Sequence, residues 1–469
     1  MIKIPAAIRL YFANNKPAII SISISIFLLT IYWIHSPKVI VKDFFDAQDY
    51  IDYAYSYGIS WKRFFNDYRA PIYPLILYII GFTNPMLDTT ILYITQVIIF
   101  LANIILSWEV LKRITENHKI KIACILLISV GLDIFWMTKT ALSEILTMFF
   151  LLLSFLFYIK MQAKFSYVIS FLFSTSFVLL SLTRPFNTYL FLPLIIFWII
   201  KNIFLYKKVK LVNYLITGIL IILPLYTYAY TNKIRHKYFG ISIEGGANLL
   251  AQVAQYHDYL PEKDEKYQET LDWAKKCRIN KEDYFTCQIK LIPPVYPNTP
   301  GSITGGRDDS YIHEVEGFSK KYLIKLLALH TRNSIEPSVK SLTELYIKEG
   351  NDSFGNKYDY WYGIRKDYPF SFIFRFLSSY LQGLHYFFAA NILFIAPIYW
   401  IYLFIKKEIK KHINLLAAYF IILYYISVTG FIAAGDFGRM VIPALPLIYI
   451  TSTVIFLNVL IKIYHKYKL

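Results

Sequence analysis

Apolar stretches of about 18 residues or more recur along most of this chain, and they constrain its fold more than any other feature. Each is long enough to cross a hydrocarbon layer of about 30 Å as an α-helix, which satisfies all of its backbone hydrogen bonds internally. The stretches fall at 18 to 35, 89 to 111, 120 to 138, 142 to 159, 165 to 183, 186 to 204, 212 to 231, 380 to 404, 413 to 432 and 440 to 461. The sequence therefore predicts an all-α polytopic membrane protein with about ten transmembrane helices.

The first apolar run could be mistaken for a signal peptide, because Lys3, Arg9 and Lys16 precede it. It lacks a small-x-small cleavage site and ends instead in the bulky sequence Tyr32-Trp33-Ile34-His35. We therefore interpret it as a retained first span.

The charge balance predicts how the chain is oriented. Lys and Arg outnumber Asp and Glu by 49 to 31, a net charge of +18, which in a soluble protein would suggest nucleic acid as a partner. Here the excess lies between spans, at 1 to 17, 112 to 121, 160 to 164, 201 to 210, 406 to 412 and 462 to 469. By the positive-inside rule these segments and both termini are expected in the cytoplasm. The protein as a whole is expected in the cell's inner membrane. The partners expected from charge are membrane lipids and no nucleic acid.

This topology divides the chain into three parts. Residues 1–231 form a membrane domain with spans 1 to 7 and a first outer loop at 36–88. Residues 232–372 form an extracytoplasmic loop domain, in which 311 to 349 is rich in helix formers. Residues 373–469 form a C-terminal membrane domain with spans 8 to 10. The apolar segment from Pro71 to Phe82 is too short to cross and is expected to lie at the outer interface.

The three cysteines are expected to differ in state. Cys124 falls in an apolar run and is expected to be an inert packing residue. Cys277 and Cys287 lie ten residues apart in the exported loop, and an oxidising compartment favours a disulfide between them. A shared metal is the alternative, but His257 and His313 show no ligand spacing to this pair.

The first outer loop carries an acidic and aromatic pattern. If 46 to 57 is helical, Asp46, Asp49, Tyr50 and Tyr53 share one face. A carboxylate held at a membrane boundary and backed by aromatic rings can accept a proton from a hydroxyl group. The alternative is a solvated acidic loop that balances nearby cations, namely Lys38, Lys42, Lys62, Arg63 and Arg69.

Five short motifs follow one another along the chain: Asp46-x-x-x-Tyr50-Ile51-x-x-Ala54, Arg69-x-Pro71-x-Tyr73-Pro74, Leu142-Ser143-Glu144, Leu182-Thr183-Arg184-Pro185 and Gly438-Arg439-x-x-x-Pro443-x-x-Pro446. Together they resemble those of the GT-C superfamily of membrane glycosyltransferases, to which aminoarabinose transferases and protein O-mannosyltransferases belong. They occur in the expected order and on one membrane face. The resemblance covers about 1 to 232 and 375 to 469, and it implies a GT-C-like bundle with a large extracytoplasmic loop.

The resemblance implies transfer of a sugar from a polyprenyl-phosphate donor to a hydroxyl group, with inversion, at the outer face. The acceptor would be an envelope glycan, a glycolipid or a protein. Asp46 matches the family's essential acid and takes the role of base. Ala47 and Gln48 depart from the common Asp-Glu or Glu-Thr pattern after that acid, so Asp49 remains an alternative base.

The departing phosphate requires cations, and arginine suits it because its planar fork offers paired donors. Arg69, Arg184 and Arg439 all fall at outer span ends, with Lys139 as a further candidate. Any of the arginines could instead snorkel or pair with an acid. Tyr50 and Tyr73, from the first two motifs, complete the expected substrate-binding set.

Glu144, in the second outer loop, is a third candidate catalytic residue whose role the sequence leaves open. It could position the acceptor, orient Lys139 or help to bind a divalent cation. A divalent cation is the only cofactor expected, and the sequence does not identify its ligands. Asp133 is expected near the outer end of span 3, where an acidic side chain is costly in free energy, and this suggests a function. The alternative is an ion pair with Lys139.

Two other classes of membrane protein compete with a glycosyltransferase. A transporter or flippase would show paired halves and charges deep inside spans, neither of which this sequence has. An O-antigen ligase or polymerase concentrates essential Arg and His in its late loop, whereas here the acid motif follows the first span.

Overall fold

In the computed structural model, seven helical segments are long and apolar enough to cross a membrane. They are Asn15–Ile34, Thr90–Ile114, Glu144–Ala163, Val212–His236, Gly383–Ile405, Ile409–Phe431 and Ile442–Tyr464, with shorter apolar helices at Tyr167–Thr183 and Pro185–Ile199. The structure describes residues 6–35, 45–60, 64–65, 69–83, 90–131, 135, 137–201, 211–236, 238–242, 249–250, 252–279, 309–343, 350–351, 357–358, 380, 383–432 and 440–467. The predicted helical multi-pass membrane fold is confirmed, and the count of ten spans stays a prediction.

The helices of the membrane part are α1 (Ala6–His35), α2 (Phe45–Ile59), α3 (Ile72–Ile79), α4 (Thr90–Ile114), α5 (His118–Ser129), α7 (Glu144–Ala163), α8 (Tyr167–Thr183), η3 (Pro185–Leu190), α9 (Phe191–Ile200), α10 (Leu211–His236), η6 (Asn391–Ile395), α18 (Ala396–Ile405), η7 (Ile409–His412), α19 (Ile413–Ile432), η8 (Ile442–Ala444) and α21 (Leu445–Tyr467). The segment between α10 and α18 contains η5 (His257–Tyr259), α12 (Gln268–Ile279), α14 (Asp309–Lys325), α15 (Leu327–Asn333), α16 (Ile335–Thr343) and the two-residue antiparallel strands β1 (Gly350–Asn351) and β2 (Lys357–Tyr358).

Helix α7 lies at the centre of the bundle. It packs against α4, α8 and η8, and 78% of its most apolar window is buried inside the protein. A helix that is apolar all round is expected in such a place, because it needs no polar face. Helix α7 begins at Glu144, so this buried helix also fixes the position of that acid.

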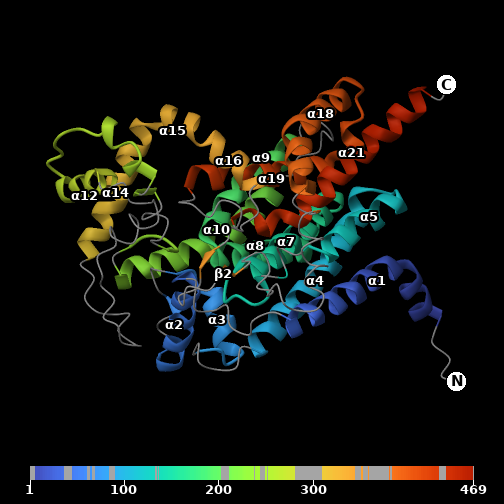
Figure 1. The fold of residues 1–469 in the computed structure, drawn as a ribbon, viewed down its shortest axis with the longest axis horizontal. Coiled ribbons are helices and arrows are strands. Elements are labelled where there is room, and N and C mark those ends of the chain that lie inside the picture. Colours follow the sequence, from blue (N-terminus) through green and yellow to red (C-terminus); the bar gives the residue numbers. More distant parts are fainter. Residues whose placement is uncertain are drawn as a thin grey trace.

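The start of α1 and the end of α21 lie at one end of the bundle, and α2, α3, α12 and α14 lie toward the other (Figure 1).

Helix α5 is shorter than the sequence predicts. An apolar span was expected over 120 to 138, but the helix ends at Ser129. Gly131 follows shortly after this end, and glycine is a poor helix former. Of the residues expected to complete this span, Phe135 and Met137 are helical and Thr138 lies in a turn, so the described part of 120 to 138 does not form one long helix.

Helix α3 confirms the short helix expected after Pro71, and its end has a clear local cause. Gly81 adopts a positive φ of 75°, and the N–H groups of Gly81 and Phe82 donate to the carbonyls of Tyr78 and Leu77. This is the Schellman arrangement, which glycine adopts at little steric cost. One face of α3 is buried and packs against α2 and α8.

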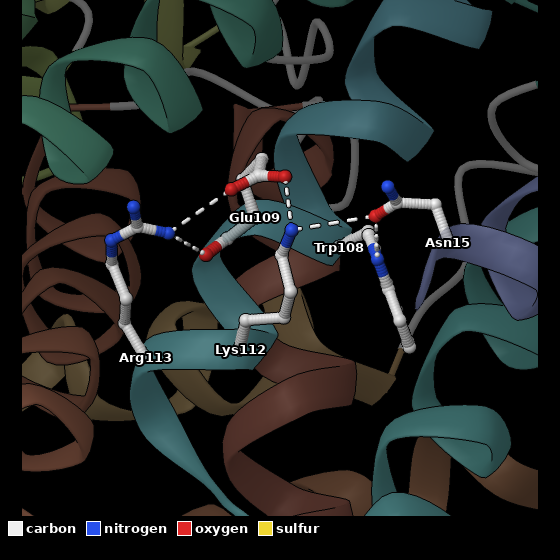
Figure 2. A network of polar contacts seen from close by, with 5 residues as sticks. All are labelled: Asn15, Trp108, Glu109, Lys112 and Arg113. Atoms are coloured by element: carbon white, nitrogen blue, oxygen red, sulfur yellow. Dashed lines mark hydrogen bonds and ion pairs between the residues drawn. The ribbon is translucent and has the colours of Figure 1, made fainter. Parts of the chain in front are cut away.

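The opposite end of the bundle is joined by a polar network between α1 and α4 (Figure 2). The buried Asn15 carboxamide oxygen accepts hydrogen bonds from Trp108 Nε1 at 2.8 Å and Lys112 Nζ at 3.4 Å. Glu109 in turn pairs with Lys112 and with Arg113. Only 33% of the most apolar part of α1 is buried inside the protein, and this network gives the N-terminal half of α1 a defined partner.

A second hydrophobic cluster lies in the segment between α10 and α18. It consists of Leu250, Val253, Ala254, Leu260, Tyr267, Leu271, Ala274, Val315, Phe318 and Tyr322. Asp264 fastens it by accepting hydrogen bonds from Lys321 Nζ at 2.6 Å and Tyr322 Oη at 2.5 Å. The predicted helices in 311 to 349 are confirmed, and the domain boundaries at 232 and 372 stay predictions.

The cysteine predictions have different outcomes. Cys124 is buried and free, as expected for a packing residue. The predicted disulfide lies outside the described residues, because Cys287 and the Cys277 side chain are not among them.

Candidate functional site

Helix α2 carries the acidic pattern of the first outer loop, and the helix expected there is confirmed. Its apolar residues Ala47, Ile51 and Ala54 are buried at helical spacing, which turns one face toward α3. Asp46 lies in the first turn, and the structure describes its backbone but not its side chain. Asp49 lies one turn further along, with its side chain partly exposed.

Asp49 forms an ion pair with Arg69, the first residue of the second motif. Arg69 donates to the same carboxylate oxygen from Nη2 at 2.5 Å and from Nε at 3.2 Å. Only 4% of Arg69 is exposed, and its guanidinium carbon lies 5.2 Å from the centre of the Tyr50 ring. Asp49 and Tyr50 therefore hold Arg69 in a defined orientation, which a cation that binds phosphate requires.

Tyr50 connects the first outer loop to the third motif. Its hydroxyl shares a hydrogen bond with Ser143 Oγ at 3.3 Å, and its ring meets that of Tyr73 edge to face at 5.0 Å. Burial, and secondarily the negative charge of Glu144, raises the pKa of the Tyr73 hydroxyl well above its usual value. Tyr73 is therefore a neutral hydrogen-bonding group throughout the physiological range.

Glu144 and Arg184 form a buried ion pair between the third and fourth motifs. Arg184 Nη2 donates to Glu144 Oε1 at 2.9 Å, and the two residues are 7% and 0% exposed. Arg184 lies in extended backbone between α8 and η3, where the following Pro185 disfavours helix. Within the described residues the second terminal nitrogen, Nη1, is buried and has no hydrogen-bond acceptor. Arg184 thus has one neutralised arm and one arm with donor capacity to spare.

Two further side chains hold the Arg184 segment in place. Tyr425 of α19 donates to the Asn187 carboxamide oxygen at 2.6 Å, and Asn187 Nδ2 donates to the Arg184 carbonyl at 3.2 Å. The backbone at Arg184 is therefore fixed from α19, far away in the sequence.

Lys139 is surrounded by aromatic rings near the same face. Its Nζ lies 4.9, 4.8 and 5.7 Å from the ring centres of Tyr32, Trp33 and Tyr93. Burial lowers the pKa of the Lys139 ammonium to about 7, while the ring faces favour its charged form. This lysine can therefore gain or lose its charge near neutral pH.

Gln96 is a member of this cluster that the sequence interpretation missed. Its Nε2 donates to the Thr140 carbonyl and to the Tyr73 hydroxyl, the latter at 3.3 Å. It thereby ties the loop that carries Lys139 to the second motif. The available signal was a carboxamide inside the apolar run 89 to 111, where polar side chains are expensive.

The fifth motif is only partly described. Arg439 lies outside the described residues, as does Asp133, so the roles expected for both stay predictions. Pro443 lies in η8, and this short helix packs against α7, the helix that Glu144 begins. No group of three or more His, Cys, Asp or Glu residues suited to a metal occurs in the described part of the chain, and the divalent cation stays a proposal.

Comparisons with known proteins find similarity only among solved structures. No protein-family model and no curated protein matches the chain. The oligosaccharyltransferase of Archaeoglobus fulgidus, solved with a tethered acceptor peptide, matches with a TM-score of 0.45 and 11% identity over 97% of this chain. ArnT of Cupriavidus metallidurans, solved with bound undecaprenyl phosphate, matches with a TM-score of 0.35 and 10% identity over 94% of this chain.

The two matched structures are longer than this chain, which spans 50% of the oligosaccharyltransferase and 77% of ArnT. Both belong to the GT-C superfamily that the five motifs resemble. Both TM-scores are below 0.5, so this similarity does not identify the roles of individual residues.

Proposed function

We propose that this protein is a membrane glycosyltransferase that transfers a sugar from a polyprenyl-phosphate donor to a hydroxyl group. The acceptor is an envelope glycan, a glycolipid or a protein, and transfer occurs with inversion at the outer face of the inner membrane. The proposal combines the five motifs with the way in which four of them meet in the fold.

One observation carries the proposal: residues from four motifs form a continuous series of contacts. Asp49 pairs with Arg69, Arg69 lies over Tyr50, Tyr50 bonds Ser143, and the next residue, Glu144, pairs with Arg184. Motifs that served only as membrane topology signals would have no reason to converge on one site. A shared substrate is the simplest reason for their convergence.

The chemistry of the proposed reaction assigns distinct roles to these groups. A sugar hydroxyl is a poor nucleophile at neutral pH and needs a base, for which we propose Asp46. Asp49 is less suited to that role, because its carboxylate already neutralises Arg69. Arg184 Nη1, Arg69 and Lys139 would bind the phosphate that departs, with preorganised donors that stabilise the developing charge.

Glu144 most simply orients Arg184 in this scheme. Its side chain is fully buried and bonded to that arginine, which leaves it poorly placed to contact an acceptor in the aqueous phase. A carboxylate in that position also lowers the cost of burying the guanidinium.

Mass spectrometry of envelope glycans provides the direct test of this function. A strain that lacks the gene should lose one sugar substituent that its parent carries, and the wild-type gene should restore it. A plasmid that encodes Asp46→Asn should not restore it. An unchanged glycan, glycolipid and glycoprotein profile in the deletion strain would contradict the proposal.

Lys139 predicts a pH dependence of donor use. Its pKa is lowered to about 7 because burial disfavours the ammonium, so the charged form dominates below that pH and the neutral form above it. If the ammonium binds the donor phosphate, kcat/KM for the donor should fall about tenfold per unit as the pH rises above the Lys139 pKa. Lys139→Arg stays charged throughout and should abolish this decline. A parental profile that stays flat in this range would refute the role.

Topology gives a further prediction. Because lysines occupy alternate loops, both termini and the segment around Lys208 should be cytoplasmic, with 232 to 370 exported. An impermeant thiol reagent applied to intact cells should label Gly305→Cys above the parental background and leave Lys208→Cys unlabelled. Labelling of Lys208→Cys would reverse the orientation and move the whole site to the cytoplasmic face.

A further inference from the structure

Helices α14, α15 and α16 form an almost continuous helical path with apolar residues on two faces. The inner face packs into the protein and includes Phe318, Tyr322 and His330. A second set of residues recurs at spacings of three or four and is exposed; we call it the outward stripe, and it consists of Ile324, Leu327, Ala328, Thr331, Ile335 and Val339. Ile324 and Ile335 are 73% and 63% exposed, which is unusual for isoleucines in a domain that contacts only water.

The position of this path in the fold identifies what borders the outward stripe. Helix α16 packs against α19, one of the segments apolar enough to cross a membrane. The contact is close, since a Cβ at Gly430 would lie 1.9 Å from Ser338 Oγ. His330 Nε2 donates to the Phe431 carbonyl at 2.9 Å, and only the tautomer that is protonated at Nε2 can make this bond.

These contacts place α15 and α16 against the C-terminal end of α19, the last residues of a segment that is apolar enough to cross a membrane. Figure 1 shows the two helices leading from α14 to α19. Helix α9 also packs against α19, and its exposed residues Leu192 and Ile196 are typical of a lipid-facing surface. Helix α19 therefore connects the helices of the outward stripe to a part of the bundle that has a lipid-facing surface.

Basic residues accompany the outward stripe. Lys325 and Arg332 are exposed, and Lys320 is 60% exposed beside its partner Glu316. Long basic side chains at the edge of an apolar face can reach lipid phosphates while the apolar residues enter the acyl boundary. This is the pattern of a helix that lies in the plane of a membrane interface.

We propose that the outward stripe rests on the outer lipid leaflet, with Ile324, Leu327, Ile335 and Val339 at the acyl boundary and Lys325 and Arg332 at the phosphates. The occupant is bilayer phospholipid. This surface would keep the exported helices at the depth where the headgroup of a lipid-linked substrate lies. The inference depends on the membrane fold and is independent of the glycosyltransferase reaction.

Spin-label accessibility in the full-length protein tests this proposal. The variants Ile324→Cys and Ile335→Cys are labelled with a nitroxide and reconstituted in bilayers of phosphatidylethanolamine and phosphatidylglycerol, and the labelled parent supplies the background signal. Collision with oxygen, which concentrates in lipid, is compared with collision with a water-soluble nickel chelate. We expect the ratio of oxygen to nickel accessibility to be severalfold higher at both positions than at Glu265→Cys.

Two reference positions calibrate the measurement. Glu265 is exposed beside the second hydrophobic cluster and should report water, whereas Ile398 of α18 is 69% exposed and should report lipid. If positions 324 and 335 are as accessible to nickel as position 265, the stripe faces water and the proposal is wrong. If both are shielded from oxygen and nickel alike, protein covers the stripe, and the proposal is equally wrong.

Discussion

The substitution Asp46→Asn should leave the amount of folded protein unchanged and reduce sugar transfer by about 10²- to 10⁴-fold, the usual value of general-base assistance. Asparagine keeps the size of the side chain and much of its hydrogen bonding, but it cannot accept the proton of the acceptor hydroxyl at neutral pH. The loss should appear in kcat and in kcat/KM alike, because the base acts in the transition state. Initial rates with a purified polyprenyl-phosphate sugar would measure it.

Two neighbouring acids on α2 serve as controls for the assignment of Asp46. Asp52→Asn should have only a small effect, because Asp52 does not belong to the motif. Asp49→Asn removes the partner of Arg69, so we expect mainly a rise in the KM for the donor. If Asp49→Asn abolishes transfer and Asp46→Asn does not, the base lies one helical turn further along. If neither matters, the proposed mechanism fails.

The membrane fold was predictable because its signals are local. Long apolar runs predict spans independently of their neighbours, and nine of the ten predicted runs correspond to apolar helices in the structure. The exception is the run at 120 to 138. Its high mean hydropathy predicted a span, although Gly131 indicated a helix end in the middle of the run. Residues just outside a helix end decide its length, and a hydropathy average does not weigh them.

The membership of the candidate site was predictable in part. Spacing placed Asp49 and Tyr50 on one helix, and the motifs drew attention to Arg69, Glu144 and Arg184. Which of these groups pair with one another depends on how distant helices pack, and no spacing rule reports that. Glu144 was expected to act on the acceptor, on Lys139 or on a cation, and the structure instead pairs it with Arg184.

Contacts supplied by residues without a motif were beyond sequence interpretation. Gln96 is one polar side chain within a long apolar helix, and its two acceptors come from helix α3 before α4 and from the Thr140 segment that follows α5. The aromatic rings around Lys139 belong to α1 and α4, where Tyr and Trp are expected as interfacial residues in any case. For Gln96 and for these aromatic residues alike, the residue type does not distinguish a role in the site from an ordinary role in a membrane helix.

The substitution Glu144→Gln should destabilise the protein by about 3–5 kcal/mol, because it removes the charged partner of a buried guanidinium. The side chain of Arg184 would then remain out of contact with water and without a counter-charge in the described surroundings. The fraction of protein that remains unaggregated on size-exclusion chromatography after heating should fall to one half at a lower temperature than for the parent. The exposed pair of Glu336 and Lys340 is the matched control, and Glu336→Gln should change stability by less than about 1 kcal/mol.

The double variant Glu144→Met with Arg184→Met separates the structural role of this pair from its proposed role in binding phosphate. Apolar side chains of similar volume can replace a buried ion pair at little cost, so the double variant should recover most of the stability that Glu144→Gln loses. It should nevertheless transfer no sugar, because the arginine fork that would bind the departing phosphate is gone. Recovery of stability together with activity would exclude Arg184 from the reaction. A Glu144→Gln variant as stable as the parent would show that the pair is not buried in the folded protein.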